Sequence, residues 1–171
     1  MTYSPFPLID QLILQGVEHF SIAPGAQSLP LVKTVADHPQ AKTKIHFDER
    51  GLAFYALGVA KATQKPAVII TTSGSAVVNL LPAILEAHHS KVPMILLTAD
   101  RPPELKECGS HQTTDQIRSL FPYLRWQFDL PFEGSDFFFR SIAAQSYFHT
   151  IQNPKGVVQI NCQIKDRSYT P

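Results

Sequence analysis

Short apolar runs alternate with stretches of helical periodicity along the whole chain. Six runs have the length and composition of strands, at residues 19–24, 44–48, 66–72, 93–100, 124–131 and 156–162. Helical patterns flank them at residues 5–16, 28–37, 49–63, 76–89, 113–121 and 135–152. Nearly continuous apolar strands separated by helices are typical of a parallel sheet that is covered on both faces. The pattern therefore predicts one α/β domain, a three-layer α/β/α fold with a six-stranded parallel sheet.

Composition narrows the classes of function. The 171 residues are 44% hydrophobic and 17% charged, as expected of a globular chain with a sizeable core. The net charge of +1 predicts no binding of nucleic acid or of anionic membrane, and no apolar run approaches the length of a membrane span. Cys108 and Cys162 lie far apart, which favours a reducing, cytoplasmic compartment. The scattered histidines predict no metal site within this chain.

Small, polar and charged residues gather after four of the predicted strands. The segments read APGAQS (23–28), FDERG (47–51), TTSGSA (71–76) and TADRPPEL (98–105). Ligands of open α/β sheets bind beyond the carboxyl ends of the strands. We therefore expect any ligand site to be assembled from these four segments.

Three of the segments also allow a purely structural interpretation. The turn around Gly74 leads into a helix whose N–H groups can bind an anion, yet glycine also permits close packing alone. Without a complete phosphate-binding motif, both interpretations stay open. Pro24 and Gly25 form a second turn, with Ser28 placed as a helix N-cap. Two prolines after Arg101 restrict where its guanidinium points, although an exposed arginine beside a turn is common.

Glu49 is the strongest candidate for a chemical role. An acidic residue in the first turn of a helix stabilises it through the helix dipole by about 0.3–1 kcal/mol. This effect operates in any surface helix and requires no chemical role. The helix 49–63 is apolar on every side, however, so we expect it to be buried and its carboxylate to have a task. Gly51 and Gly58 lie on one helical face and predict that another element packs close to it.

Taken together, the segments resemble one enzyme family. The stretches HFDERGLAFYALGVAKAT, PAVIITTSGSAVVNLLPAILEA and VPMILLTADRPPELKECGSHQTTDQ are similar to the N-terminal, pyrimidine-binding domain of the thiamine-diphosphate-dependent MenD family, the 2-succinyl-5-enolpyruvyl-6-hydroxy-3-cyclohexene-1-carboxylate synthases. The likeness covers about residues 10–162. It implies the thiamine-diphosphate-binding fold. It also implies that residues 1–171 are a single pyrimidine-binding (PYR-type) domain, a fragment of a longer multidomain enzyme.

The resemblance also implies roles for individual residues. Glu49 matches the catalytic glutamate that bonds N1′ of the cofactor's aminopyrimidine and exchanges a proton with it. The residues implied to border the cofactor are Pro24, Gly25, Glu49, Ser73, Gly74, Ser75 and Asn79. Those implied to contact substrate are Gln27, Arg101, His111 and Gln112.

The implied reaction is decarboxylation of 2-oxoglutarate followed by addition of the succinyl carbanion to isochorismate, in menaquinone biosynthesis. The chain contains no G-D-G segment of the kind that holds Mg²⁺ and the diphosphate. The resemblance places that segment in the C-terminal domain of another subunit of a homo-oligomer. We therefore expect the isolated chain to be inactive.

Two departures from the family pattern keep alternatives open. The family usually reads P-G-S-R-S-T where this chain has Ala26 and Gln27, and it reads G-A-N-Q where this chain has Ser110 and His111. Loss of a charge-assisted arginine contact costs about 1.5–3 kcal/mol. Three explanations stay open: another cation substitutes, activity is weak, or the substrate differs, as in acetolactate synthases or 2-oxo acid decarboxylases. The TADRPPEL segment argues against that alternative. A stand-alone nucleotide-binding or interaction module is a third hypothesis, which the carboxylate of Glu49 disfavours.

Overall fold

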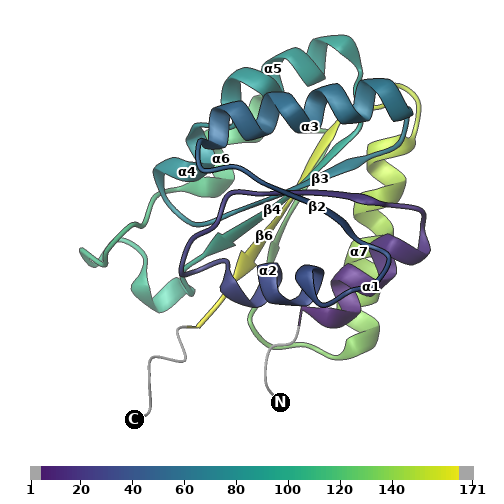
Figure 1. Cartoon of the computed structure of the whole chain (residues 1–171). Coiled ribbons are helices and arrows are strands. Elements are labelled where there is room, and N and C mark those ends of the chain that lie inside the picture. The colour runs from purple at the N-terminus through teal and green to yellow at the C-terminus, as the bar shows by residue number, and fades with distance from the viewer. Residues whose placement is uncertain (1–4, 166–171) are drawn as a thin grey trace.

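Six parallel strands form one sheet at the centre of the molecule (Figure 1). A computed structural model describes residues 5–165. The strand order is β2-β1-β3-β4-β6-β5, and every neighbouring pair is parallel. The predicted three-layer α/β/α fold is confirmed. The strands are β1 (His19–Ile22), β2 (Lys42–Ile45), β3 (Ala67–Thr71), β4 (Met94–Asp100), β5 (Trp126–Leu130) and β6 (Val157–Gln163).

Helices cover both faces of the sheet (Figure 1). One face carries α1 (Phe6–Leu14), α2 (Leu29–Ala36) and α7 (Asp136–Ile151), and the other carries α3 (Glu49–Thr63), α4 (Ser75–Val78), α5 (Leu81–Ser90) and α6 (Gln116–Leu120). The predicted helix 76–89 is in fact two helices, because Pro82 has no N–H to donate to the carbonyl of Val78 and is accommodated only in a first turn. No helix within residues 5–165 is both long and apolar enough to cross a membrane.

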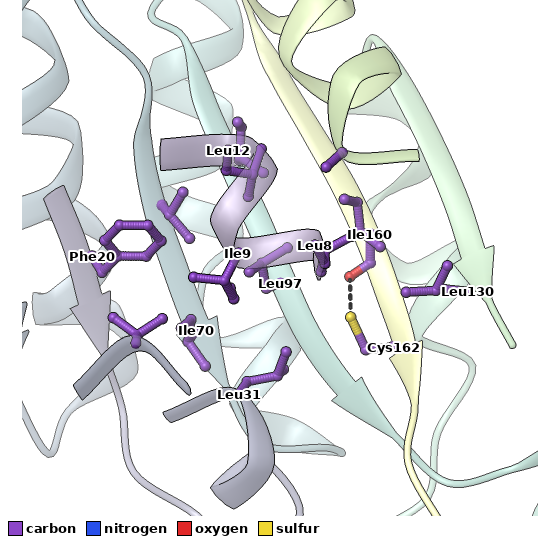
Figure 2. Close-up of a cluster of buried hydrophobic side chains, with 14 of the residues drawn as sticks. Leu8, Ile9, Leu12, Phe20, Leu31, Ile70, Leu97, Leu130, Ile160 and Cys162 are labelled. Carbon is purple, nitrogen blue, oxygen red and sulfur yellow. Dashed lines mark hydrogen bonds between the residues drawn. The ribbon is translucent and has the colours of Figure 1, made fainter. Parts of the chain in front are cut away.

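Two apolar clusters hold the layers together, one on each face of the sheet. On the face of α1, α2 and α7, side chains of α1 pack against the central strands and against α2 (Figure 2). On the opposite face, α3 and α5 pack on β3, β4 and β6. The labelled members of the first cluster are Leu8, Ile9, Leu12, Phe20, Leu31, Ile70, Leu97, Leu130, Ile160 and Cys162.

The strand at one edge differs from its prediction. The apolar letters at 44–48 predicted a buried strand, but β2 covers Lys42–Ile45 and all four residues are exposed. The central strands β3, β4 and β6 are buried throughout. Lysines on an edge strand oppose pairing with other chains, which explains why this strand is polar.

Helix α3 is buried on one face only, so the expectation of a fully buried helix is wrong for this chain. Leu52, Ala56 and Ala60 face the sheet, whereas Phe54 and Tyr55 are 45% and 44% exposed. A Cβ added at Gly51 would lie 3.0 Å from the His46 ring, but one added at Gly58 would meet no described atom within 4 Å. We call the exposed side chains of Phe47, Phe54 and Tyr55, together with Gly58, the α3 outer face.

The burial pattern predicts where a truncation destabilises the fold. Ile70 is fully buried in the central strand β3, so Ile70→Ala should lower the free energy of unfolding by about 2–5 kcal/mol. Phe148→Ala removes a larger side chain that is 55% exposed, and should cost far less. Urea unfolding of both variants tests this prediction. Equal decreases in the free energy of unfolding would contradict the assignment of Ile70 to the core.

Candidate functional site

The four segments singled out in the sequence follow four adjacent strands. β2, β1, β3 and β4 are neighbours in the sheet and are parallel, so their carboxyl ends meet at one edge. The chain crosses from β2 over β1 to β3, which makes the gap between β1 and β3 a topological switch point. Ligands of doubly wound sheets bind at such points.

The turn after β1 touches the end of β3 at this switch point. A Cβ added at Gly25 would lie 2.3 Å from Cβ of Thr72, so only glycine fits there. Ser28 occupies the N-cap position of α2 as predicted, but its hydroxyl donates to the carbonyl of Gly25 (3.0 Å) and caps no helix N–H. The hydroxyl therefore closes the turn.

Two glutamines hold the small-residue turn after β3. Gly74 has φ of +77°, a conformation that favours glycine. Its N–H donates to Oε1 of Gln116 (2.8 Å), and Nε2 of Gln112 donates to the carbonyl of Ser73 (3.1 Å). Gln112, predicted to contact substrate, thus supports the turn through its amide nitrogen. Gln116 was missed because a single buried glutamine in a short amphipathic stretch gives no sequence signal.

Glu49 and Asn79 lie side by side, although 30 residues separate them. The carboxylate of Asp48 accepts from the N–H of Gly51 (2.7 Å) and so begins α3 at Glu49. This bond lowers the pKa of Asp48, which keeps the cap ionised. Nδ2 of Asn79 donates to Oε2 of Glu49 at 3.3 Å. Glu49 is only partly buried, so its carboxylate lies at the surface of this chain.

Hydroxyl groups at the same edge of the sheet lack protein partners. Within the described residues, Oγ1 of Thr71 and Oγ of Ser73 are buried without a hydrogen-bond partner. A buried polar group left unpaired costs about 1–3 kcal/mol, and each one calls for an explanation. Unpaired hydroxyls beside the turn at Gly74, on the same edge of the sheet as Glu49 and Asn79, are compatible with a small polar heterocycle such as an aminopyrimidine.

The predicted substrate residues occupy different environments. Gln27 is 2% exposed, and its amide contacts main-chain groups and Arg101. Pro24 and Ala26, in the same turn, are exposed, as is His111 in the loop after β4. The structure thus brings Gln27 and Arg101 together, and leaves His111 at the surface of this chain.

A second polar cluster lies between the ends of β4 and β6. Asp100 is fully buried and accepts from Nζ of Lys106 (2.8 Å) and Nδ2 of Asn161 (2.8 Å). Burial lowers the pKa of Lys106, but the hydrogen bond and charge of Asp100, helped by Asp129, outweigh it and raise the pKa above its ordinary value. This ion pair fastens the loop that follows Arg101 to the sheet.

Comparison with known proteins identifies the family. The sequence model described as "Thiamine pyrophosphate enzyme, N-terminal TPP binding domain" matches residues 7–119. The chain belongs to this family. Thiamine pyrophosphate is another name for thiamine diphosphate. The residues at the carboxyl edge of this pyrophosphate-enzyme domain are therefore compatible with the cofactor after which the family is named.

Three curated relatives of this thiamine pyrophosphate enzyme domain carry the same name. The chain is 45% identical over 161 residues to a 2-succinyl-5-enolpyruvyl-6-hydroxy-3-cyclohexene-1-carboxylate synthase of Salinibacter ruber. It is also 45% identical over 162 residues to one of Rubrobacter xylanophilus, and 42% identical over 163 residues to one of Bacillus pumilus. These matches cover 92–93% of this chain but only 27–28% of each relative. The chain thus spans little more than a quarter of their length.

The described residues contain no grouped metal ligands. Within residues 5–165, no three His, Cys, Asp or Glu side chains are grouped so that they could hold a metal ion. Cys108 is exposed, whereas Cys162 is buried and its thiol donates to the carbonyl of Ile160 (3.6 Å).

The contact of Gly25 with Thr72 predicts that alanine substitutions at Gly25 and Gly58 change the stability in opposite directions. Gly25→Ala should lower the free energy of unfolding by about 1–3 kcal/mol, because the added methyl group meets Thr72. Gly58→Ala places the same methyl group in open space inside a helix, and should raise stability by about 0.5–1 kcal/mol. Thermal unfolding of the isolated chain distinguishes the two. A neutral Gly25→Ala would mean that the turn does not approach β3 this closely.

The buried ion pair predicts both a mutational and a pH effect. Lys106→Met leaves Asp100 buried beside an apolar group; breaking such a pair costs roughly 3–5 kcal/mol, and the 28% exposure of Lys106 places the loss near the lower end. Because the pKa of Lys106 is raised on folding, its contribution is complete below its ordinary value of about 10.5 and is lost as the pH rises through the folded value.

Guanidinium unfolding between pH 8 and pH 11.5 measures both effects. Lys61→Met is the matched control, since Lys61 forms an exposed pair with Glu86 (3.1 Å) and should change stability little. Equal losses in the two variants would show that the pair of Lys106 with Asp100 is not buried in solution.

Proposed function

We propose that this domain binds the aminopyrimidine of thiamine diphosphate within a complete 2-succinyl-5-enolpyruvyl-6-hydroxy-3-cyclohexene-1-carboxylate synthase. The observation that carries the proposal is the position of Glu49 at the start of α3, hydrogen-bonded to Asn79 and set at the carboxyl edge of the sheet. The complete enzyme would decarboxylate 2-oxoglutarate and join the succinyl group to isochorismate in menaquinone biosynthesis. The shared name of the relatives supports this reaction.

In this proposal each side chain at the carboxyl edge has a defined task. Glu49 holds and exchanges the proton at N1′ of the ring, and Asn79 orients the Glu49 carboxylate through its amide. The ring is bordered by the turn of Pro24 and Gly25 and by the turn of residues 73–75. When bound, thiamine diphosphate supplies the electron sink that decarboxylation of a 2-oxo acid requires.

Substrate recognition is assigned to the loop after β4. Arg101 offers a planar set of donors suited to a carboxylate, and both 2-oxoglutarate and isochorismate carry carboxylates. His111 and Gln112 lie in the same loop and complete the proposed substrate side. The absence of arginine at position 27 is the one feature that favours a different 2-oxo acid. Assaying the complete enzyme with 2-oxoglutarate plus isochorismate, against pyruvate alone, decides between the two.

The α3 outer face supports the proposal that a partner completes the site. Phe47 is 87% exposed, and Phe54 and Tyr55, on the side of α3 that faces away from the sheet, are 45% and 44% exposed. Exposed apolar side chains gathered on one surface mark an interaction site. We assign this face to the C-terminal diphosphate-binding domain of another subunit, which would also hold Mg²⁺ and the diphosphate in a cytoplasmic homo-oligomer. The 171-residue chain alone would then be inactive.

Replacing the Glu49 carboxylate by an amide tests the proposal directly. In the complete enzyme, Glu49→Gln should fold with unchanged thermal stability. It should slow hydrogen–deuterium exchange at C2 of the bound cofactor by about 10²- to 10⁴-fold, the usual contribution of one acid–base group.

Glu104→Gln serves as the control, because Glu104 is an exposed glutamate whose carboxylate lies 3.6 Å from Lys165. It should exchange at the wild-type rate. Fast exchange in Glu49→Gln would remove Glu49 from its proposed role.

A further inference from the structure

Gln27 has contacts that differ from those of a substrate ligand. Its side chain is 2% exposed. Nε2 donates to the carbonyl of Asp100 at 3.2 Å and to the carbonyl of Ile164, and Oε1 accepts from Nη1 of Arg101. We propose that Gln27 is a positioning residue that holds the guanidinium of Arg101 for binding a carboxylate. This inference rests on the substrate role proposed for Arg101.

The partners of Gln27 permit only one orientation of its amide. A rotated amide would point its NH₂ group at the guanidinium, donor against donor, and its oxygen at two carbonyl oxygens. The observed orientation satisfies both ends of the amide. Gln27 therefore joins the end of β4, the chain after β6 and the side chain of Arg101 at one buried point.

Arg101 is fixed at both ends by this arrangement. Its main-chain N–H donates to Oδ1 of Asp100 (2.8 Å), and Pro102 after it is buried. Gln27 holds the other end, the guanidinium. A guanidinium that is already ordered loses less conformational freedom when it binds a planar carboxylate. Recognition of the acidic substrate is thus carried by Arg101, and the neutral amide at position 27 is suited to support it.

An arginine at position 27 would not serve in the same way. The buried space between Arg101 and two carbonyls provides acceptors for an amide nitrogen, but a second guanidinium would face the first without the acceptor that Oε1 supplies. Where the family pattern has an arginine at position 27, this chain therefore has a buried, neutral glutamine that supports Arg101.

Arginine-selective ¹⁵N NMR of the 171-residue chain tests the positioning role without any ligand. Gln27→Met removes every polar contact of the amide, and rotation about the guanidinium bonds of Arg101 should become at least tenfold faster. Gln27→Glu keeps an acceptor for Arg101 but loses both donors, and should keep slow rotation while lowering the unfolding temperature. Gln127→Met is the control: Gln127 also donates to a main-chain carbonyl, that of Ile117 (2.8 Å), and its loss should leave Arg101 unchanged.

The outcomes separate a positioning role from a merely structural one. If Gln27→Met leaves the rotation of Arg101 slow, or if Gln27→Glu accelerates it equally, the inference is overturned.

Kinetics of the complete enzyme then test the link to substrate. Gln27→Met should raise KM for 2-oxoglutarate or isochorismate at least tenfold while kcat changes little, and Gln127→Met should change neither. Faster rotation together with an unchanged KM would support the positioning of Arg101 but overturn its proposed substrate role.

Discussion

A carboxylate buried at the end of a central strand must find a full set of donors, and much of this molecule is arranged around how Asp100 obtains them. Lys106 supplies the charge, Asn161 an amide, and the chain after β4 turns so that the N–H of Arg101 supplies another donor. An ion buried without such partners would cost several kcal/mol. The loop after β4 is consequently held at its first residue and again at Lys106.

The same polar layer extends across the sheet to the turn after β3. Oδ1 of Asn161 accepts from Thr98 (2.8 Å) and from Nε2 of Gln116 (2.8 Å), and Gln116 in turn accepts from the N–H of Gly74. A continuous series of hydrogen bonds therefore runs from the ion pair at β4 to the turn at β3. Networks of this kind are rigid when every member is satisfied. The loop after β4 and the turn after β3 are thus linked by hydrogen bonds beneath the candidate site.

The sequence predicted the architecture well, because helical and strand periodicities depend on which faces are buried, and most faces here are buried within the chain itself. The sequence-based prediction was wrong where a helix face is not covered by another part of this chain. The apolar letters of α3 predicted a helix covered all round, yet Phe54 lies on the α3 outer face. For the site, the adjacency of the four strand ends follows from the parallel topology, whereas the role proposed for Glu49 rests on the resemblance. Gln116 and the buried contacts of Gln27 depend on tertiary packing that no local pattern encodes.

The α3 outer face also has a consequence for biosynthesis. The family's description places this domain at the N-terminus, so a ribosome completes it while any later domain of the same polypeptide is still being made. During this interval Phe47 and Ile45 stand next to an unpaired strand edge, an arrangement prone to misassembly. Lys42 and Lys44 alternate along that same strand. Charged residues at such positions act as gatekeepers, which means that they oppose edge-to-edge strand pairing between nascent chains during this interval.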